Sequence, residues 1–225
     1  MKIGVFGGTF NPVHFGHLRS AEEVRTSFGL GRVFFIPSGN PPLKRKDLAE
    51  ADHRLRMVEI ASKNNPFFEV LDIECVRPGK SYTVNTLEQL MKDFPENEIY
   101  FILGIDAFLD MPNWREPEKI LSLAHFVVLS RPGKKFQDLF HSPHMNVKKT
   151  VLTGLDKGRL NSHETVSRNA KKIFLLHVTP IGISSTGIRN CVKKKSSIKY
   201  LLPAEVESYI ISEDLYRPKK TEETK

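Results

Sequence analysis

Residues 2–28 constrain the fold more than any other part of the sequence. An apolar run at residues 2–6 leads directly into Gly7 and Gly8, and apolar residues of helical period then follow as far as Gly29. The run has the length of a buried strand, and a glycine after the last periodic residue is typical of a helix end. A strand that turns at once into a helix is the repeating unit of a parallel sheet with crossover helices.

The turn between this strand and this helix predicts a site for nucleotide phosphate. Gly7 and Gly8 let the backbone approach a phosphate closely, and the helix start points unpaired N–H groups and its positive dipole end at the same place. His14 and His17 are three residues apart and fall on one face of the helix start. Their rings can donate hydrogen bonds to phosphate oxygens as negative charge builds up. The alternative is a tight turn whose histidines only cap or pack.

Strands and helices alternate along the rest of the chain. This pattern predicts an α/β fold with a doubly wound (Rossmann-like), mainly parallel sheet and helices on both faces, in which ligands bind beyond the carboxyl ends of the strands. Further strands are expected at residues 32–37, 67–73, 99–103, 125–130 and 173–177, and further helices at 51–63, 83–94 and 203–211.

Length and composition favour one ordinary globular domain, because 225 residues with 40% apolar side chains can bury one substantial core. We expect this domain to span residues 1–217, with a flexible tail at 218–225. Cys75 and Cys191 are too few for a disulfide framework or a zinc site. The sequence shows neither a membrane-spanning apolar run nor a secretory leader, so we expect a cytoplasmic protein with no membrane partner.

The net charge of +8 suits small anionic substrates and nucleic acids alike. Residues 134–172 hold nine lysines and arginines against three acidic residues, which is +6 of the total. This segment lacks clear periodicity, and we interpret it as a solvated basic insertion, with a lid or an interface as alternatives. A nucleic-acid-binding protein would interleave aromatic and basic residues, which this segment does not do, so we expect no nucleic-acid partner.

Residues 7–17 form the turn that contains His14 and His17, and we call them the histidine turn. Two loops outside it offer polar groups to the same crevice at the strand ends. Residues 36–45 form a loop after the second expected strand, and its Lys44 and Arg45 either reach a second phosphate or are solvated. Residues 81–87 place hydroxyls at a helix start, where they either bind an acidic group or simply cap the helix.

Two further segments lie after later strands. Gly104 lets a ligand approach the strand end, the Asp106 carboxylate suits ribose hydroxyls, and Trp114 suits stacking on an aromatic ring or simple packing. Residues 183–189 put hydroxyls at a helix start, with Arg189 one turn later. A capping box would leave Arg189 unexplained, so phosphate binding is favoured.

In this order the segments resemble the bacterial nicotinate-mononucleotide adenylyltransferases, in the nucleotidyltransferase superfamily with a His-x-Gly-His signature. The matching motifs are GGTFNPVHFGH, PP-x-K, SYTVNTL, GIDAFLDMPNW, VVLSRPG and ISSTGIR. The resemblance implies transfer of the AMP moiety of ATP to nicotinate mononucleotide, with release of pyrophosphate, in NAD biosynthesis. Pantetheine-phosphate adenylyltransferases and cytidylyltransferases share the histidine and Ser-Ser-Thr motifs. The SYTVNTL segment and the GID segment followed by Trp114 favour the adenylyltransferase that acts on a pyridine nucleotide.

The resemblance also implies roles for the matching residues. His14, His17 and Arg189 are implied as the catalytic residues. The residues implied in ATP binding are Gly7, Gly8, Thr9, Phe10, Gly104, Asp106, Ile183, Ser184, Ser185 and Thr186. Those implied in binding the pyridine nucleotide are Lys44, Tyr82, Thr83, Trp114 and Arg131. Leu43 stands where the family often has histidine in PP-x-K, so the contribution of that loop rests on Lys44.

The implied reaction is an in-line attack of the mononucleotide phosphate on the α-phosphorus of ATP, which needs no covalent enzyme intermediate. Mg²⁺ is expected as the cofactor, entering with ATP and bound by phosphates and water rather than by protein. Asp106 and Asp110 are one helical turn apart and form an alternative metal pair, but a ribose-binding Asp106 and a solvated Asp110 fit better. Nicotinamide mononucleotide and phosphopantetheine are the alternative acceptors. The sequence leaves open whether the chain forms homo-oligomers.

Overall fold

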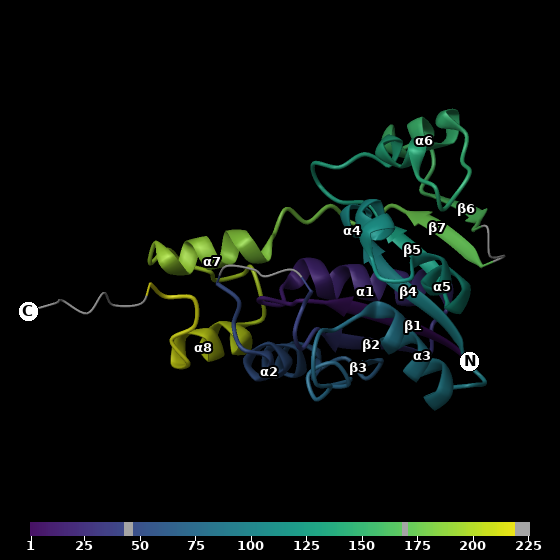
Figure 1. Cartoon of the computed structure of the whole chain (residues 1–225). Helices are drawn as coiled ribbons and strands as arrows, with labels where there is room; N and C mark the ends of the chain where they lie inside the picture. Colours follow the sequence, from purple (N-terminus) through teal and green to yellow (C-terminus); the bar gives the residue numbers. More distant parts are fainter. Residues whose placement is uncertain (43–46, 168–170, 219–225) are drawn as a thin grey trace, which may run out of the picture.

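A seven-stranded sheet forms the centre of the computed structural model, which describes residues 1–42, 47–167 and 171–218 (Figure 1). The strand order is β3-β2-β1-β4-β5-β7-β6, and every neighbouring pair is parallel except β6 and β7. The strands are β1 (Lys2–Gly8), β2 (Arg32–Pro37), β3 (Phe68–Val70), β4 (Glu98–Gly104), β5 (His125–Leu129), β6 (Ser162–Val166) and β7 (Lys172–Leu176).

The sheet is buried on both faces, because alternate residues of one strand belong to different core clusters. In β2, Phe34 and Ile36 join one cluster while Val33 and Phe35 join the other. One face is covered by α1 (Phe15–Phe28), α2 (Ala51–Ser62), α7 (Ser185–Lys193) and α8 (Ala204–Ser212). The other is covered by α3 (Thr83–Asp93), α4 (Ile105–Asp110), α5 (Pro117–Leu123), α6 (Lys149–Asp156) and the 3-10 helices η1 (Met111–Asn113) and η2 (Phe136–His141). The prediction of a doubly wound sheet is confirmed.

The interpretation of residues 134–172 as a solvated insertion is wrong. Figure 1 shows α6 and β6 at one end of the sheet. The apolar side chains of η2 and α6 lie in the core, among them Phe136, Leu139, Leu152 and Leu155. The two helices are joined by the Asp156 carboxylate, which accepts hydrogen bonds from the N–H groups of residues 136 and 137 at 2.7 and 3.0 Å. Most lysines of this segment are exposed, so the segment presents charge to solvent and apolar side chains to the core.

No helix within the described parts of the chain is long and apolar enough to cross a membrane. The loop residues Leu43 and Lys44 lie outside the described residues, as does nearly all of the expected tail, of which only Pro218 is described.

Candidate active site

A cleft of about 830 Å³ opens at the carboxyl ends of β1, β4 and β5. The chain order reverses here, because β1 pairs with β2 on one side and with β4 on the other. A doubly wound sheet binds its ligands at such a point. Of the predicted site residues, all but Lys44 line this cleft, and Lys44 lies outside the described residues. Their roles in binding remain predictions.

The cleft has two walls that come from opposite faces of the sheet. We call the first the α7 wall, formed by residues 7–17 and by residues 183–189 at the start of α7. We call the second the α3 wall, formed by residues 81–86 at the start of α3 and by residues 104–115 of α4 and η1, with Arg131 beside them.

The α7 wall contains the two histidines at the start of α1. Their rings are stacked with centroids 3.8 Å apart, and the N–H of His14 donates to Nδ1 of His17 at 3.3 Å. A neutral His17 that accepts at Nδ1 carries its proton on Nε2, which leaves Nε2–H as a donor. Gly16 makes room for this pair, because a Cβ there would lie 3.0 Å from Cε1 and Nδ1 of the His14 ring.

Burial keeps both imidazoles neutral in the free protein. Desolvation, assisted by the charge of Arg131, lowers the pKa of His14 to about 4. Desolvation, then His14 and then Arg131 lower the pKa of His17 well below its ordinary value. Each ring therefore offers one N–H donor near neutral pH, and an arriving phosphate would raise both pKa values because negative charge favours the imidazolium form.

The start of α7 is bound to the turn that precedes the histidines. The Ser185 hydroxyl donates to the Pro12 carbonyl at 2.8 Å, and Nη1 of Arg189 donates to the Asn11 carbonyl at 2.7 Å. Ser184 is the N-cap of α7 and accepts the N–H of residue 187, so the capping alternative is correct for this serine. Hydroxyls, a guanidinium and the α7 N-terminus thus meet the histidine turn at one place.

The residues that support this turn are not among the predicted site residues. Asn11 is 4% exposed, and its Nδ2 donates to the Asp47 carbonyl at 2.9 Å. Its Oδ1 accepts from the N–H of Ala49 at 3.1 Å and from the Tyr216 hydroxyl at 2.9 Å. Burial raises the pKa of Tyr216, so the phenol stays protonated and continues to donate. No local pattern in the sequence links residues 11 and 216.

In the part of the α3 wall formed by residues 104–115 and Arg131, side chains contact one another. Nη1 of Arg131 lies 2.5 Å from a carboxylate oxygen of Asp106, and Nε1 of Trp114 donates to Asp110 at 3.3 Å. Both aspartates of the alternative metal pair therefore have partners. A side chain at Gly104 would displace the Asp106 carboxylate, because a Cβ there would lie 2.7 Å from Oδ1 of Asp106. Among the described residues there is no group of three or more His, Cys, Asp or Glu suited to a metal ion.

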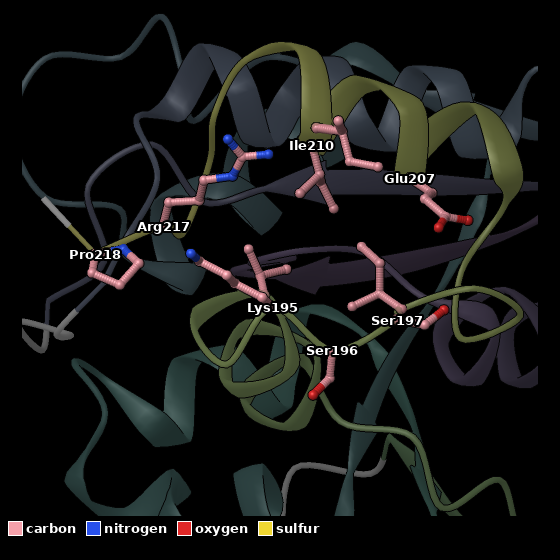
Figure 2. Close-up of a pocket in the computed structure, with 10 residues that line it drawn as sticks. Lys195, Ser196, Ser197, Glu207, Ile210, Arg217 and Pro218 are labelled. Carbon is pink, nitrogen blue, oxygen red and sulfur yellow. The ribbon is translucent and has the colours of Figure 1, made fainter. Parts of the chain in front are cut away.

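A smaller cavity of about 460 Å³ lies apart from the cleft, between α7 and α8, and shares no lining residue with it (Figure 2). Ile210 and other apolar side chains form much of its lining, with Lys195 and Arg217 among the polar residues. Arg217 pairs with Asp214 at 2.6 Å. The polar groups that converge on the cleft have no counterpart among the residues that line this second cavity, so the cleft is the candidate active site.

Comparisons with known proteins agree with this geometry. A family model described as cytidylyltransferase-like matches residues 5–191. A Desulfitobacterium hafniense protein named probable nicotinate-nucleotide adenylyltransferase is 42% identical over 217 residues, covering 96% of this chain and 96% of that protein. A Moorella thermoacetica protein of the same name is 40% identical and covers 97% of this chain and 93% of that protein.

A solved structure shares the fold at lower identity. It is the Plasmodium falciparum nicotinic acid mononucleotide adenylyltransferase complexed with NaAD, with a TM-score of 0.73, 21% identity and coverage of 96% of this chain and 97% of that one. The family model and the relatives at 40% identity or more, which match nearly the whole chain, show that it belongs to the nicotinate-nucleotide adenylyltransferase family.

Proposed function

We propose that this chain transfers the AMP moiety of ATP to nicotinate mononucleotide, producing nicotinate adenine dinucleotide and pyrophosphate. The observation that carries the proposal is the convergence of the His14–His17 pair and the start of α7 on one cleft whose facing wall holds Trp114. The names of the bacterial relatives point to the same reaction.

In this proposal the α7 wall binds the triphosphate of ATP. His14 and His17 donate to the α- and β-phosphates as charge builds up, because Nε2–H of His17 is free to donate when Nδ1 accepts. Arg189 and the hydroxyls of Ser184 and Thr186 hold the β- and γ-phosphates at the N-terminus of α7, while Ser185 donates to the Pro12 carbonyl and positions the helix start. Positioning and charge stabilisation are then the main sources of catalysis, as expected for a phosphoryl-type transfer.

In this proposal the α3 wall binds the acceptor, except that its Gly104 and Asp106 contact ATP. Trp114 stacks on the pyridine ring, while Tyr82, Thr83 and Arg131 supply donors to the anionic groups of nicotinate mononucleotide. The pairing of Arg131 with Asp106, which is assigned to the ribose of ATP, is evidence that the two substrate positions are adjacent. Donors aimed at the pyridine carboxylate would face the NH₂ of the nicotinamide form, so we expect the acid to be preferred.

Mg²⁺ enters with ATP in this proposal, and the family reaction normally needs such a divalent cation. The aspartates of the cleft do not form a cage for it, because Asp106 pairs with Arg131 and Asp110 accepts from Trp114 and Asn113. The cation would therefore be held through phosphate oxygens and water, where it withdraws negative charge from the phosphates.

The direct test is pyrophosphate release from ATP and Mg²⁺ with three acceptors in parallel: nicotinate mononucleotide, nicotinamide mononucleotide and phosphopantetheine. We expect the highest kcat/KM with nicotinate mononucleotide, by about 10- to 100-fold over the nicotinamide form. CTP in place of ATP controls for the choice of nucleotide. Equal efficiency on both pyridine nucleotides would contradict the preference, and release with phosphopantetheine alone would contradict the proposed acceptor.

A further inference from the structure

We propose that Arg54 is a positioning residue that fixes the ATP-binding turn relative to the loop that leads to the acceptor site. This inference rests on the proposed function and adds a residue that neither the sequence motifs nor the cleft lining identifies. Arg54 belongs to α2 and is only 1% exposed. It does not line the cleft, so it acts on the substrates only through the loops that it holds.

The guanidinium of Arg54 donates to main-chain carbonyls from three separate places in the chain. Nη1 donates to the carbonyl of Thr9, in the histidine turn, at 3.0 Å and to the carbonyl of Ser38 at 2.5 Å. Nη2 donates to the carbonyl of Gly39 at 2.8 Å, and Nε donates to the carbonyl of Ala49 at 2.9 Å. One buried side chain thus joins the turn after β1 to the loop after β2.

The loop after β2 continues the connection to the α3 wall. Ser81 donates its N–H to the carbonyl of Asn40 at 2.9 Å, and its hydroxyl accepts the N–H of Asn40 at 3.2 Å. Close packing fixes the same loop, because a Cβ on Gly39 would lie 2.0 Å from the Glu74 carbonyl oxygen. A continuous path of hydrogen bonds and main chain therefore leads from Thr9 through the Arg54 side chain to Ser81, immediately before Tyr82 and Thr83.

The geometry that in-line transfer requires explains why the link from Thr9 to Ser81 affects the rate. In-line transfer requires the attacking phosphate and the α-phosphorus to be held in a narrow geometry, and a misplacement of about 1 Å can cost about 100-fold in rate. A guanidinium has five donors in a rigid plane, so it sets the separation of the carbonyls that it binds. The flexible ammonium of lysine cannot reproduce that fork, and an apolar side chain would leave the carbonyls unpaired.

The test compares four variants by steady-state kinetics at a temperature where circular dichroism shows each to be folded. We expect Arg54→Met to lower kcat by about 100-fold, with a smaller change in KM for either substrate, and Arg54→Lys to recover part of that loss. Arg56→Met controls for charge, because Arg56 lies two residues away in α2 on the exposed surface. Met57→Ala controls for stability, because Met57 is fully buried in the same helix, belongs to a core cluster and has an apolar side chain that cannot donate to the loop carbonyls.

Hydrogen exchange supplies a readout that does not depend on turnover. We expect faster amide exchange at residues 7–12 and 38–42 in Arg54→Met, but not in Met57→Ala. The inference is overturned if folded Arg54→Met keeps kcat within about threefold of the wild type, or if Met57→Ala loses as much. If the wild type itself transfers no AMP to nicotinate mononucleotide, the proposed function fails, while the exchange experiment still decides whether Arg54 holds both loops.

Discussion

The α7 wall and the Arg131–Asp106 part of the α3 wall are held in place by different kinds of contact. In the α7 wall, Ser185 and Arg189 donate to main-chain carbonyls of the histidine turn, and the buried Asn11 satisfies its side chain with three further partners. In the α3 wall, the Arg131 and Asp106 side chains that pair with each other are 52% and 40% exposed.

From this difference we infer how rigid each of the two substrate sites is. Main-chain hydrogen bonds in a buried framework fix donors before the ligand arrives, which is the arrangement that stabilises developing charge most effectively. An exposed ion pair contributes little to stability, and its partners can exchange for groups of a ligand at low cost. We therefore expect a rigid site for the triphosphate and an adaptable one for the acceptor.

The largest effect is expected from the rigid wall. His17→Ala removes a donor aimed at the phosphates, and we expect kcat to fall by about 100- to 1,000-fold, since loss of one fixed donor to developing charge has an effect of this size. His163→Ala is the matched control, because it removes an imidazole from the edge strand β6. Measured kcat values that fall equally in both variants would contradict a special role for the α7 wall.

The desolvated histidines also predict how stability depends on pH. The pKa of His14 is about 4 in the folded protein, against 6.5 without burial. As pH falls below about 6.5 the unfolded chain binds a proton that the folded chain does not, so stability is lost down to pH 4, by about 3 kcal/mol. Urea unfolding at pH 7 and pH 4.5 should show a smaller loss in His14→Gln. The control His163→Gln should follow the wild type, and an unchanged loss in His14→Gln would mean that His14 is solvated.

The smallest effect is expected from the adaptable wall. Trp114→Ala removes a stacking surface, and we expect KM for nicotinate mononucleotide to rise by about tenfold, while KM for ATP changes little. Trp114→Phe keeps an aromatic face but loses the hydrogen bond to Asp110, so it should recover most of the affinity. Steady-state kinetics with each substrate varied in turn separate the two KM values. An equal rise in both would show that the two walls do not bind separate substrates.

The sequence predicted the parts of the fold and the site that depend on neighbouring residues. The turn after β1 combines a strand, two glycines and a helix within a short stretch, so its position at the strand ends follows from local rules. The start of α7 was found in the same way, because hydroxyls at a helix start followed by Arg189 have a local meaning.

The parts that the sequence missed depend on distant residues or on very short elements. Arg54 and Arg56 are two residues apart in one helix, yet one is buried under two loops and the other pairs with Glu59 at the surface. Helical spacing puts Arg54 on the buried face of α2 with Met57 and Val58, but nothing near it in the chain indicates which carbonyls it binds. The strand β6 has the sequence Ser-His-Glu-Thr-Val at the sheet edge and lacks the apolar run of an inner strand, while η2 and α6 span too few turns to show a period.

The bonds from Arg189 and Tyr216 to Asn11 have a consequence for the order in which the protein is made. A ribosome synthesises the histidine turn well before the side chains that bind Asn11, which follow 178 and 205 residues later. A nascent chain therefore displays its glycine turn long before that turn has its final support. Ribosome-bound chains of increasing length should gain ATP affinity only after Tyr216 has left the exit tunnel, so the histidine turn reaches its bound geometry long after it is translated.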